Sequence, residues 1–565
     1  MIGIGQLENA YRDLRAMDAR LPIATRLLNY LQVTVRVSDT DLARIPKSRP
    51  VLLVANHPFG ILEGAVLADL LLRIRPDVKV LANGLLASIA EGRDLIIPVD
   101  PMGGAQAVRA NRHGVRESIE FLAAGGLLVV FPAGEVSHIS WNLRGVSDAP
   151  WNSATLRILA AARRTGADVA IVPVHIAGRN SLLFQAAGLV HPRLRSALLA
   201  RELLNKRGGC VQARIGNPVS AAKLASLATD RDRIEYLRWR TYLLAARNDY
   251  KPRTNLPLPR AKRENGPEPI APPEDSATLA HEVAKLTPLI ATPEFSVYAA
   301  HSCEIPTVLR EIGRLREIAF RAVGEGAGKA RDLDAFDAHY VHLFLWNARK
   351  QEIAGAYRLA GTDTVRELYT ATLFQYGNEF RQLLGPALEL GRSFVRVEYQ
   401  RALAPLLLLW KGIAKYVVQH PRYRILFGAV SISNRYQAVS RHLMVSFLER
   451  TAFLKDWATL VSSRNPFRAE CPAVSGAEPL DVDDLSDVIS DLDPSQPGVP
   501  VLLRQYLKLG GKLLGFNVDP KFSNALDGLI LVDLTKTEPK LLDRFLGAGE
   551  AAKFLNHHRS SHATH

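Results

Sequence analysis

The first half of the chain alternates between short apolar runs and amphipathic segments. Runs rich in Val, Ile and Leu predict buried strands, and segments with apolar residues three and four positions apart predict helices. The expected strands are 51–55, 78–82, 95–99, 127–131, 168–176 and 210–215. The expected helices are one or two within 7–34, then 62–74, 104–123 and 153–164, with a basic amphipathic helix at 193–207. This alternation predicts an α/β sheet with helices on both faces.

The second half has a different order of elements. The pattern predicts a helix at 305–323, a hairpin of strands 339–346 and 352–359, a strand at 388–395, a helix at 401–419, a strand at 423–432 and a helix from Arg435. An acidic stretch at 478–493 predicts a solvated loop or short helix.

A composition break separates the two halves. Residues 251–280 are dense in proline and charge, which cannot support a core and predicts a linker. At 565 residues the chain is too long for one ordinary core, so we expect domains at 1–250 and 281–545. The end of the chain, 546–565, predicts a disordered tail.

The charge of the chain narrows the class of partner. Lys and Arg total 71 against 56 Asp and Glu, which gives a net charge of +15. This favours an anionic membrane, a nucleic acid or an acidic carrier protein as a neighbour. The basic segments lack interleaved aromatic residues, so nucleic acid is disfavoured.

Cysteine content and hydropathy suggest a location. Cys210, Cys303 and Cys471 lie far apart without metal or disulfide spacing, which fits a reducing compartment. We see no signal peptide and no apolar run long enough to cross a bilayer. We therefore expect a cytoplasmic protein, bound peripherally to the inner face of the cytoplasmic membrane, with no metal or cofactor.

Residues 51–64, VLLVANHPFGILEG, carry the first candidate chemistry. A strand that ends at Asn56-His57-Pro58 and continues as a helix places His57 on a strand-to-helix turn, where α/β sheets bind ligands. A neutral imidazole there can take a proton from a hydroxyl nucleophile while a carboxylate fixes its tautomer. We predict that His57 is a general base and that Glu63 orients it. The alternative is a purely structural histidine.

Two further strand ends extend this pattern. Phe131-Pro132-Ala133-Gly134-Glu135 and the run around His175 follow in order, and the three together resemble the glycerophospholipid acyltransferase family. In that family a His and an Asp five residues later form the catalytic pair, and Phe-Pro-Glu-Gly binds glycerophosphate. Here Leu62 occupies the Asp position. The resemblance implies that Glu135 and Arg144 line the acceptor or donor site, and the departures suit an acceptor without a glycerophosphate head.

The second half resembles another family. Its element order is that of the GNAT fold, and Arg316/Phe320, Asp332/Asp334/Asp337 and Glu389/Arg392 resemble motifs of acyl-homoserine-lactone synthases, which use acyl carrier protein. The resemblance implies that Glu389, Asp334 and Asp337 handle an amine. It also implies that Arg358 and Arg392 hold donor phosphopantetheine or shape the pocket. Alternatively, Arg392 pairs with Glu389 or Asp337 and only holds the fold.

The whole chain resembles bifunctional ornithine lipid synthases, often labelled haemolysins. This implies that the second half N-acylates an amino acid, ornithine being favoured, with a 3-hydroxyacyl chain from acyl carrier protein. The first half then O-acylates the resulting lyso-lipid, from acyl carrier protein or coenzyme A. Two alternatives stay open: a lysophospholipid acyltransferase with a regulatory second half, and a non-enzymatic membrane-binding protein.

Overall fold

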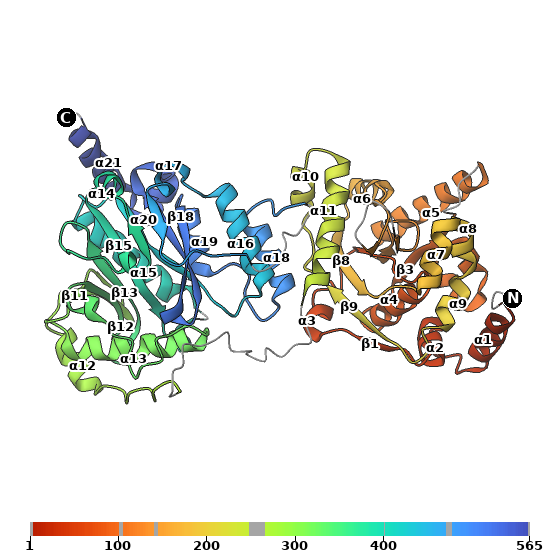
Figure 1. Ribbon diagram of the computed structural model, residues 1–565, viewed down its shortest axis with the longest axis horizontal. Helices are drawn as coiled ribbons and strands as arrows, with labels where there is room; N and C mark the ends of the chain where they lie inside the picture. The colour runs from red at the N-terminus through yellow and green to blue at the C-terminus, as the bar shows by residue number, and fades with distance from the viewer. Residues whose placement is uncertain are drawn as a thin grey trace. The chain divides into compact units, whose positions relative to one another are not determined.

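The computed structural model consists of two compact units, each with its own sheet (Figure 1). The first unit is Met1–Tyr250 with Val474–Gly498, and the second is Lys251–Ala473 with Val499–His565. The structure describes residues 4–100, 105–139, 145–247, 266–400, 402–469 and 477–562. Both units are α/β, which confirms the predicted fold class.

The first unit is built on a seven-stranded sheet in the order β1-β9-β8-β2-β5-β3-β4. Neighbouring strands are parallel except for the antiparallel pair β8 and β9. Every residue of β2 and β5 is buried, because parallel strands covered on both faces need continuous apolar runs. The strands are β1 (Thr34–Arg36), β2 (Val51–Ala55), β3 (Val78–Asn83), β4 (Ile96–Val99), β5 (Leu127–Val130), β8 (Ala170–Ala177) and β9 (Cys210–Ile215).

The helices of this unit lie close to their predicted positions. The predicted basic helix at 193–207 is divided into two short helices. The main helices are α1 (Ile4–Ala16), α2 (Ile23–Tyr30), α4 (Leu62–Leu72), α5 (Ala105–Ala123), α6 (Ala154–Arg164), α7 (Leu182–Val190), α8 (Pro192–Ala197), α9 (Leu199–Leu204) and α11 (Asp230–Leu243). A short hairpin of β6 (His138–Ile139) and β7 (Val146–Ser147) follows β5.

The acidic stretch of the second half belongs to the first unit, contrary to the predicted domain at 281–545. It forms helix α18 (Val482–Leu492), which Figure 1 shows in blue against the yellow α11. Asp484 and Asp491 are almost fully buried and lie 3.1 and 2.6 Å from the guanidinium of Arg240. The predicted solvated segment is therefore a buried ionic contact, because charges distant in the sequence meet.

The second unit is built on an eight-stranded sheet in the order β10-β11-β12-β13-β15-β16-β19-β18. All neighbouring strands are antiparallel except β15 and β16, which run parallel. The strands are β10 (Ile290–Ala291), β11 (Phe295–His301), β12 (Val341–Asn347), β13 (Glu352–Gly361), β15 (Ala387–Val395), β16 (Ile425–Ile432), β18 (Lys512–Asp519) and β19 (Ala525–Asp533). A separate pair, β14 (Phe374–Tyr376) and β17 (Val461–Ser463), lies outside this sheet.

Helices pack against this sheet through two apolar clusters. Side chains of α12 and α13 join residues of β12, β13 and β15 in one cluster, and the face of β16 and β19 forms another with β14 and β17. The helices are α12 (Ser276–Val283), α13 (Pro306–Ala322), α14 (Asn378–Leu384), α15 (Leu403–Gln419), α16 (Ala438–Thr451), α17 (Lys455–Ala458), α19 (Val501–Lys508), α20 (Pro539–Leu546) and α21 (Ala548–His562).

Two segments that the sequence predicts to be unstructured contain ordered parts. Within the predicted linker 251–280, the backbone at Glu268 and Ala271 is bonded to Gly328 and Ala330, and α12 begins at Ser276. The predicted disordered tail 546–565 contains α21, which buries Ala551 and Phe554. In both cases a few apolar or backbone contacts fix a segment whose composition alone predicts disorder. Among the described helices, none is long and apolar enough to span a membrane.

Candidate functional sites

The turn after β2 brings His57 and Glu63 together. The Nδ1 atom of His57 lies 2.8 Å from Oε1 of Glu63, which is fully buried, whereas the imidazole keeps 16% of its surface exposed. The same carboxylate oxygen accepts the backbone N–H groups of Phe59 and Gly60 at 3.0 and 2.8 Å. These contacts fix Glu63 at the first turn of α4 and leave Nε2 as the ring nitrogen that can meet a substrate.

The charge state of Glu63 follows from these neighbours. Burial disfavours its ionised form, but the imidazole of His57 and the donated backbone N–H groups outweigh burial, so the pKa of Glu63 lies below its usual value. Glu63 is therefore an anion beside His57 near neutral pH. An anion there stabilises the imidazolium that forms when His57 takes a proton.

Other elements hold the His57 turn. The imidazole stacks on Phe131 with ring centroids 4.5 Å apart. Asp148, which is fully buried, accepts the backbone N–H of His57 at 3.1 Å and the indole N–H of Trp151 at 2.8 Å. Sequence reasoning missed Asp148, because a single acid in a loop carries no signal until the fold places it against the turn.

The other predicted residues of this site have different surroundings. Glu135 is 45% exposed and lies 2.5 Å from the guanidinium of Arg195 on α8. His175 is buried on β8, and burial together with the charge of Arg214 lowers its pKa to about 4, so it is neutral at pH 7. Arg144 lies outside the described residues.

The second unit gathers the predicted charged motifs into one network. Arg316 and Arg358 are buried and both contact Asp337, at 3.1 Å in each case. Burial opposes ionisation of Asp337, but the two arginines outweigh it and lower its pKa to about 2. Asp334 lies 2.6 Å from Arg358. Asp334, Asp337 and Arg358 are therefore largely engaged with one another.

Glu389 is also fully engaged. It is buried on β15, and its carboxylate accepts the hydroxyl of Tyr340 and the backbone N–H groups of Tyr369 and Thr370, the last at 2.8 Å. The contacts anchor the short helical turn at Tyr369–Thr372. The carboxylate thus faces this turn and Tyr340.

Arg392 lies on β15 beyond the residues that pair with β16. The two parallel strands pair only from Ala387 to Glu389, and a Cβ on Gly428 would lie 2.1 Å from the carbonyl oxygen of Leu390, so only glycine permits this approach. Arg392 then adopts a positive φ of 48° in an irregular part of the β13–β15 ladder. Its guanidinium lies 4.9 Å from the ring centroids of both Tyr369 and Phe522.

Sequence reasoning missed a second group of acids beside Arg392. Glu325 follows α13 and accepts the hydroxyl of Ser431 on β16 at 3.0 Å, and Ser431 is paired directly with Asp527 on β19. Burial raises the pKa of Glu325 to about 7. These residues come from three distant parts of the chain, so no motif links them.

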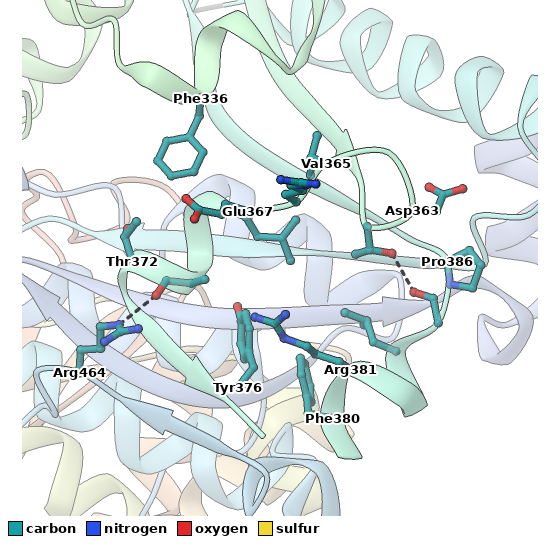
Figure 2. Close-up of a pocket in the computed structure, with 16 residues that line it drawn as sticks. Phe336, Asp363, Val365, Glu367, Thr372, Tyr376, Phe380, Arg381, Pro386 and Arg464 are labelled. Atoms are coloured by element: carbon teal, nitrogen blue, oxygen red, sulfur yellow. Dashed lines mark hydrogen bonds between the residues drawn. The ribbon is translucent and has the colours of Figure 1, made fainter. Parts of the chain in front are cut away.

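A separate cavity of about 560 Å³ opens beside the Tyr369–Thr372 turn. Figure 2 shows the rings of Phe336, Tyr376 and Phe380 around it together with Arg381 and Arg464. None of the predicted site residues lines this cavity.

The comparisons with known proteins match both units. Residues 20–250 match the family model described as Acyltransferase, and residues 315–411 match the Acetyltransferase (GNAT) domain. The first unit thus matches an acyltransferase domain and the second a GNAT domain, as the sequence resemblance implied.

Individual relatives are similar over part of the chain. A glycine N(alpha)-acyltransferase of Bacteroides thetaiotaomicron is 36% identical over 191 residues, which cover 31% of this chain and 56% of that protein. The chain thus spans little more than half the length of this curated relative. Among solved structures, the 1-acyl-sn-glycerophosphate (LPA) acyltransferase PlsC of Thermotoga maritima is 21% identical with a TM-score of 0.25, covering 40% of this chain and 75% of that one. FeeM, an N-acyl amino acid synthase from uncultured soil microbes, is 10% identical with a TM-score of 0.25, covering 44% of this chain and 95% of that one.

Proposed function

We propose that the protein is a bifunctional acyltransferase that makes a diacylated amino-acid lipid. The second unit N-acylates an amino acid with a 3-hydroxyacyl chain, and the first unit esterifies the hydroxyl of that chain. The observation that carries the proposal is the His57–Glu63 pair, at 2.8 Å on a strand-end turn of an acyltransferase domain. The GNAT match and the glycine N(alpha)-acyltransferase relative support the amine-acylating half.

In the first unit, His57 is the general base. Its Nε2 takes the proton of the acceptor hydroxyl while the hydroxyl oxygen attacks the thioester carbon. The carbon–sulfur bond breaks, and the imidazolium returns the proton to the leaving thiolate. Glu63 stays ionised throughout and stabilises the imidazolium.

In the second unit, an amine attacks the thioester of the donor. The amine must arrive deprotonated or lose its proton to a nearby carboxylate, and the thiolate leaves with a proton. Ornithine and glycine are the acceptor candidates, the first from the family resemblance and the second from the curated relative.

We further propose that the donor is carried by acyl carrier protein, an acidic partner. The cavity beside Tyr369–Thr372 has exposed Arg366, Arg381 and Arg464 on its wall against two exposed acids, Asp363 and Glu367. This excess of positive charge suits a phosphate or an acidic surface. For the first unit, either acyl carrier protein or coenzyme A would serve.

We propose that the first unit meets its lyso-lipid substrate at an anionic membrane surface. Support comes from α7 and α8, where large apolar side chains face solvent, and from the exposed Arg179 and Arg201, which precede and follow these helices in the sequence. These apolar residues are Leu182 (78% exposed), Leu183, Leu189, Val190 (77% exposed) and Leu194. Apolar residues that enter the headgroup layer between arginines are typical of peripheral membrane proteins. We refer to these five residues as the α7–α8 surface.

Lipid analysis tests the proposal. The full chain, His57→Ala and Glu389→Ala would each be expressed in a host without amino-acid lipids. We expect a diacylated lipid from the full chain, the monoacyl form from His57→Ala and neither from Glu389→Ala. If only phosphatidate-type products rise, the lysophospholipid acyltransferase alternative replaces the proposal. If His57→Ala changes nothing while membrane binding persists, the non-enzymatic alternative does.

A further inference from the structure

A group of three buried acids lies close enough to Arg392 to feel its charge, but no ion pair joins any of them to a cation among the described residues. Glu325, Asp519 and Asp527 are each at least 93% buried. Ser431 and Asp527 are directly opposed on β16 and β19, and Asp519 lies two positions beyond the partner of Asp527 on β18, so all three side chains are on one face of the sheet. Glu325 reaches the same face through its hydrogen bond with Ser431.

Asp527 is the unusual member of this group. Among the residues that the structure describes, its carboxylate has neither a hydrogen-bond donor nor an ion-pair partner, although it is 95% buried. Buried polar groups are normally satisfied, so an unpaired carboxylate in this position suggests a missing ligand. Burial, together with the negative charges of Asp519 and Glu325, raises the pKa of Asp527.

Arg392 is poorly satisfied as well. Its nearest carboxylate oxygens, on Asp332 and Asp334, are 3.7 and 3.6 Å away, beyond hydrogen-bond distance. Its Nε has no hydrogen-bond partner among the described residues. The guanidinium is held between Tyr369 and Phe522 by ring contacts, and these leave its N–H groups available to an anion.

We propose that Glu325, Asp519, Asp527 and Arg392 form the binding pocket for the amino-acid acceptor. The carboxylates bind its α-ammonium, and Arg392 binds its α-carboxylate. This inference rests on the proposed N-acyltransferase function and names the acceptor as a free, zwitterionic α-amino acid.

The pocket also explains where the reacting proton goes. When the amine attacks the thioester, a bound ammonium has to give up one proton, and Glu325 is hydrogen-bonded in the same cluster. A carboxylate whose pKa is about 7 accepts a proton at neutral pH more readily than an ordinary glutamate. The remaining charged groups around it are Arg392 and Arg435, whose positive charges oppose the upward shift.

The test is calorimetric binding of glycine and of L-ornithine to the full-length protein, with steady-state N-acylation measured alongside. Asp527→Asn keeps the shape of the side chain, and we expect it to weaken binding of both amino acids by about tenfold or more. Arg392→Lys should weaken binding of the amino acid but not of its methyl ester. Asp533→Asn, on the same strand and bonded to Thr535, is the matched control and should bind normally.

Proton exchange supplies a readout that a structural defect would not imitate. Because the pKa of Glu325 is raised to about 7, its carboxyl is partly protonated at neutral pH, so binding an ammonium should release protons, which appears as a dependence of the binding heat on the buffer. Glu325→Gln should reduce this release while the thermal stability is retained.

Equal binding by Asp527→Asn and the unmodified protein would overturn the inference, and a loss confined to ornithine would overturn the α-ammonium assignment. These results differ from failure of the proposed function. In that case the unmodified protein would N-acylate no amino acid, whatever it binds.

Discussion

At the scale of single residues, the surroundings of each carboxylate decide its chemistry. Glu63 is buried but receives two backbone N–H groups and faces His57, so its pKa is lowered and it is an anion. Glu325 is nearly as buried but receives one hydroxyl, and its pKa rises to about 7. The same side chain thus serves as a fixed negative charge in one unit and as a proton acceptor in the other.

The first prediction concerns Glu63. Replacing it with Gln removes the charge that stabilises the His57 imidazolium, so we expect kcat for O-acylation to fall by about 10²- to 10⁴-fold. The measurement is the rate of ester formation on a monoacylated amino-acid lipid. Asp69→Asn, a buried acid on the same helix bonded to Thr25, is the control and should lower stability but not kcat. Equal losses in the two variants would contradict the role of Glu63.

A second prediction concerns pH and Glu325. Its pKa in the folded protein, about 7, exceeds the value near 4.5 expected when unfolded, so the folded state binds the extra proton. The free energy of unfolding that this group contributes therefore falls as pH rises from about 4.5 to 7, by about 3 kcal/mol. Compared with the unmodified protein, Glu325→Gln should become relatively more stable across this window. Denaturant unfolding at pH 5 and pH 8 measures the free energy of unfolding of both proteins. A difference between them that does not change with pH would contradict the raised pKa of Glu325.

At the scale of elements, α18 shows that a segment can belong to a unit far from it in the sequence. Its acids surround Arg240, and the Nη2 of Arg240 lies 2.6 Å from Asp491. Asn217 also donates its backbone N–H to Asp491 at 2.7 Å. These contacts explain why Val474–Gly498 packs with the first unit.

The third prediction follows from this contact. Asp491→Ala leaves the buried Arg240 without one of its two carboxylates, so we expect the first unit to lose about 3–5 kcal/mol of unfolding free energy. Asp487 is also on α18, is 46% exposed and pairs with Lys223. Asp487→Ala should therefore lower the free energy of unfolding by less than about 1 kcal/mol. Thermal unfolding of both variants compares them directly. Similar effects would mean that α18 is not anchored through Arg240.

At the scale of the whole molecule, charge and surface apolarity act together. In the proposed membrane binding, the net charge of +15 would attract the chain to anionic surfaces, and the α7–α8 surface would supply the apolar contact. Because charge attraction is screened and apolar insertion is not, salt separates the two contributions.

The fourth prediction is membrane binding by the α7–α8 surface. Co-sedimentation with phosphatidylglycerol vesicles should weaken as NaCl rises from about 0.1 to 1 M, since the Debye length falls from about 10 to 3 Å. Leu182→Ser with Val190→Ser should weaken binding at every salt concentration. Leu407→Ser, an exposed leucine of the second unit, is the control. Undiminished binding by the double variant would exclude this surface.

Much of the fold could be predicted from the sequence. The predicted elements from 51–55 to 210–215 lie within a few residues of those observed, because hydrophobic periodicity records which faces are buried. His57 and Glu63 were predictable as a pair, since six residues across one strand-end turn keep them within reach.

Contacts between distant segments were not predictable. Asp148 supports the His57 turn, and Asp484 and Asp491 surround Arg240, yet none of the three stands in a motif. The acids around Arg392 come from the loop after α13 and from β18 and β19, and only the sheet pairing brings them together.

The sequence by itself determined the two α/β units, the strand-end histidine and its nearby carboxylate, because local periodicity and short spacing encode them. The tertiary structure alone decided which charges are satisfied. It engages Glu389 and Asp337 with partners, whereas among the described residues the carboxylate of Asp527 has no hydrogen-bond donor and the Nε of Arg392 has no acceptor. The reason is physical: the energy of a buried charge depends on its neighbours in space, and pairing across a sheet sets those neighbours independently of their distance in the chain.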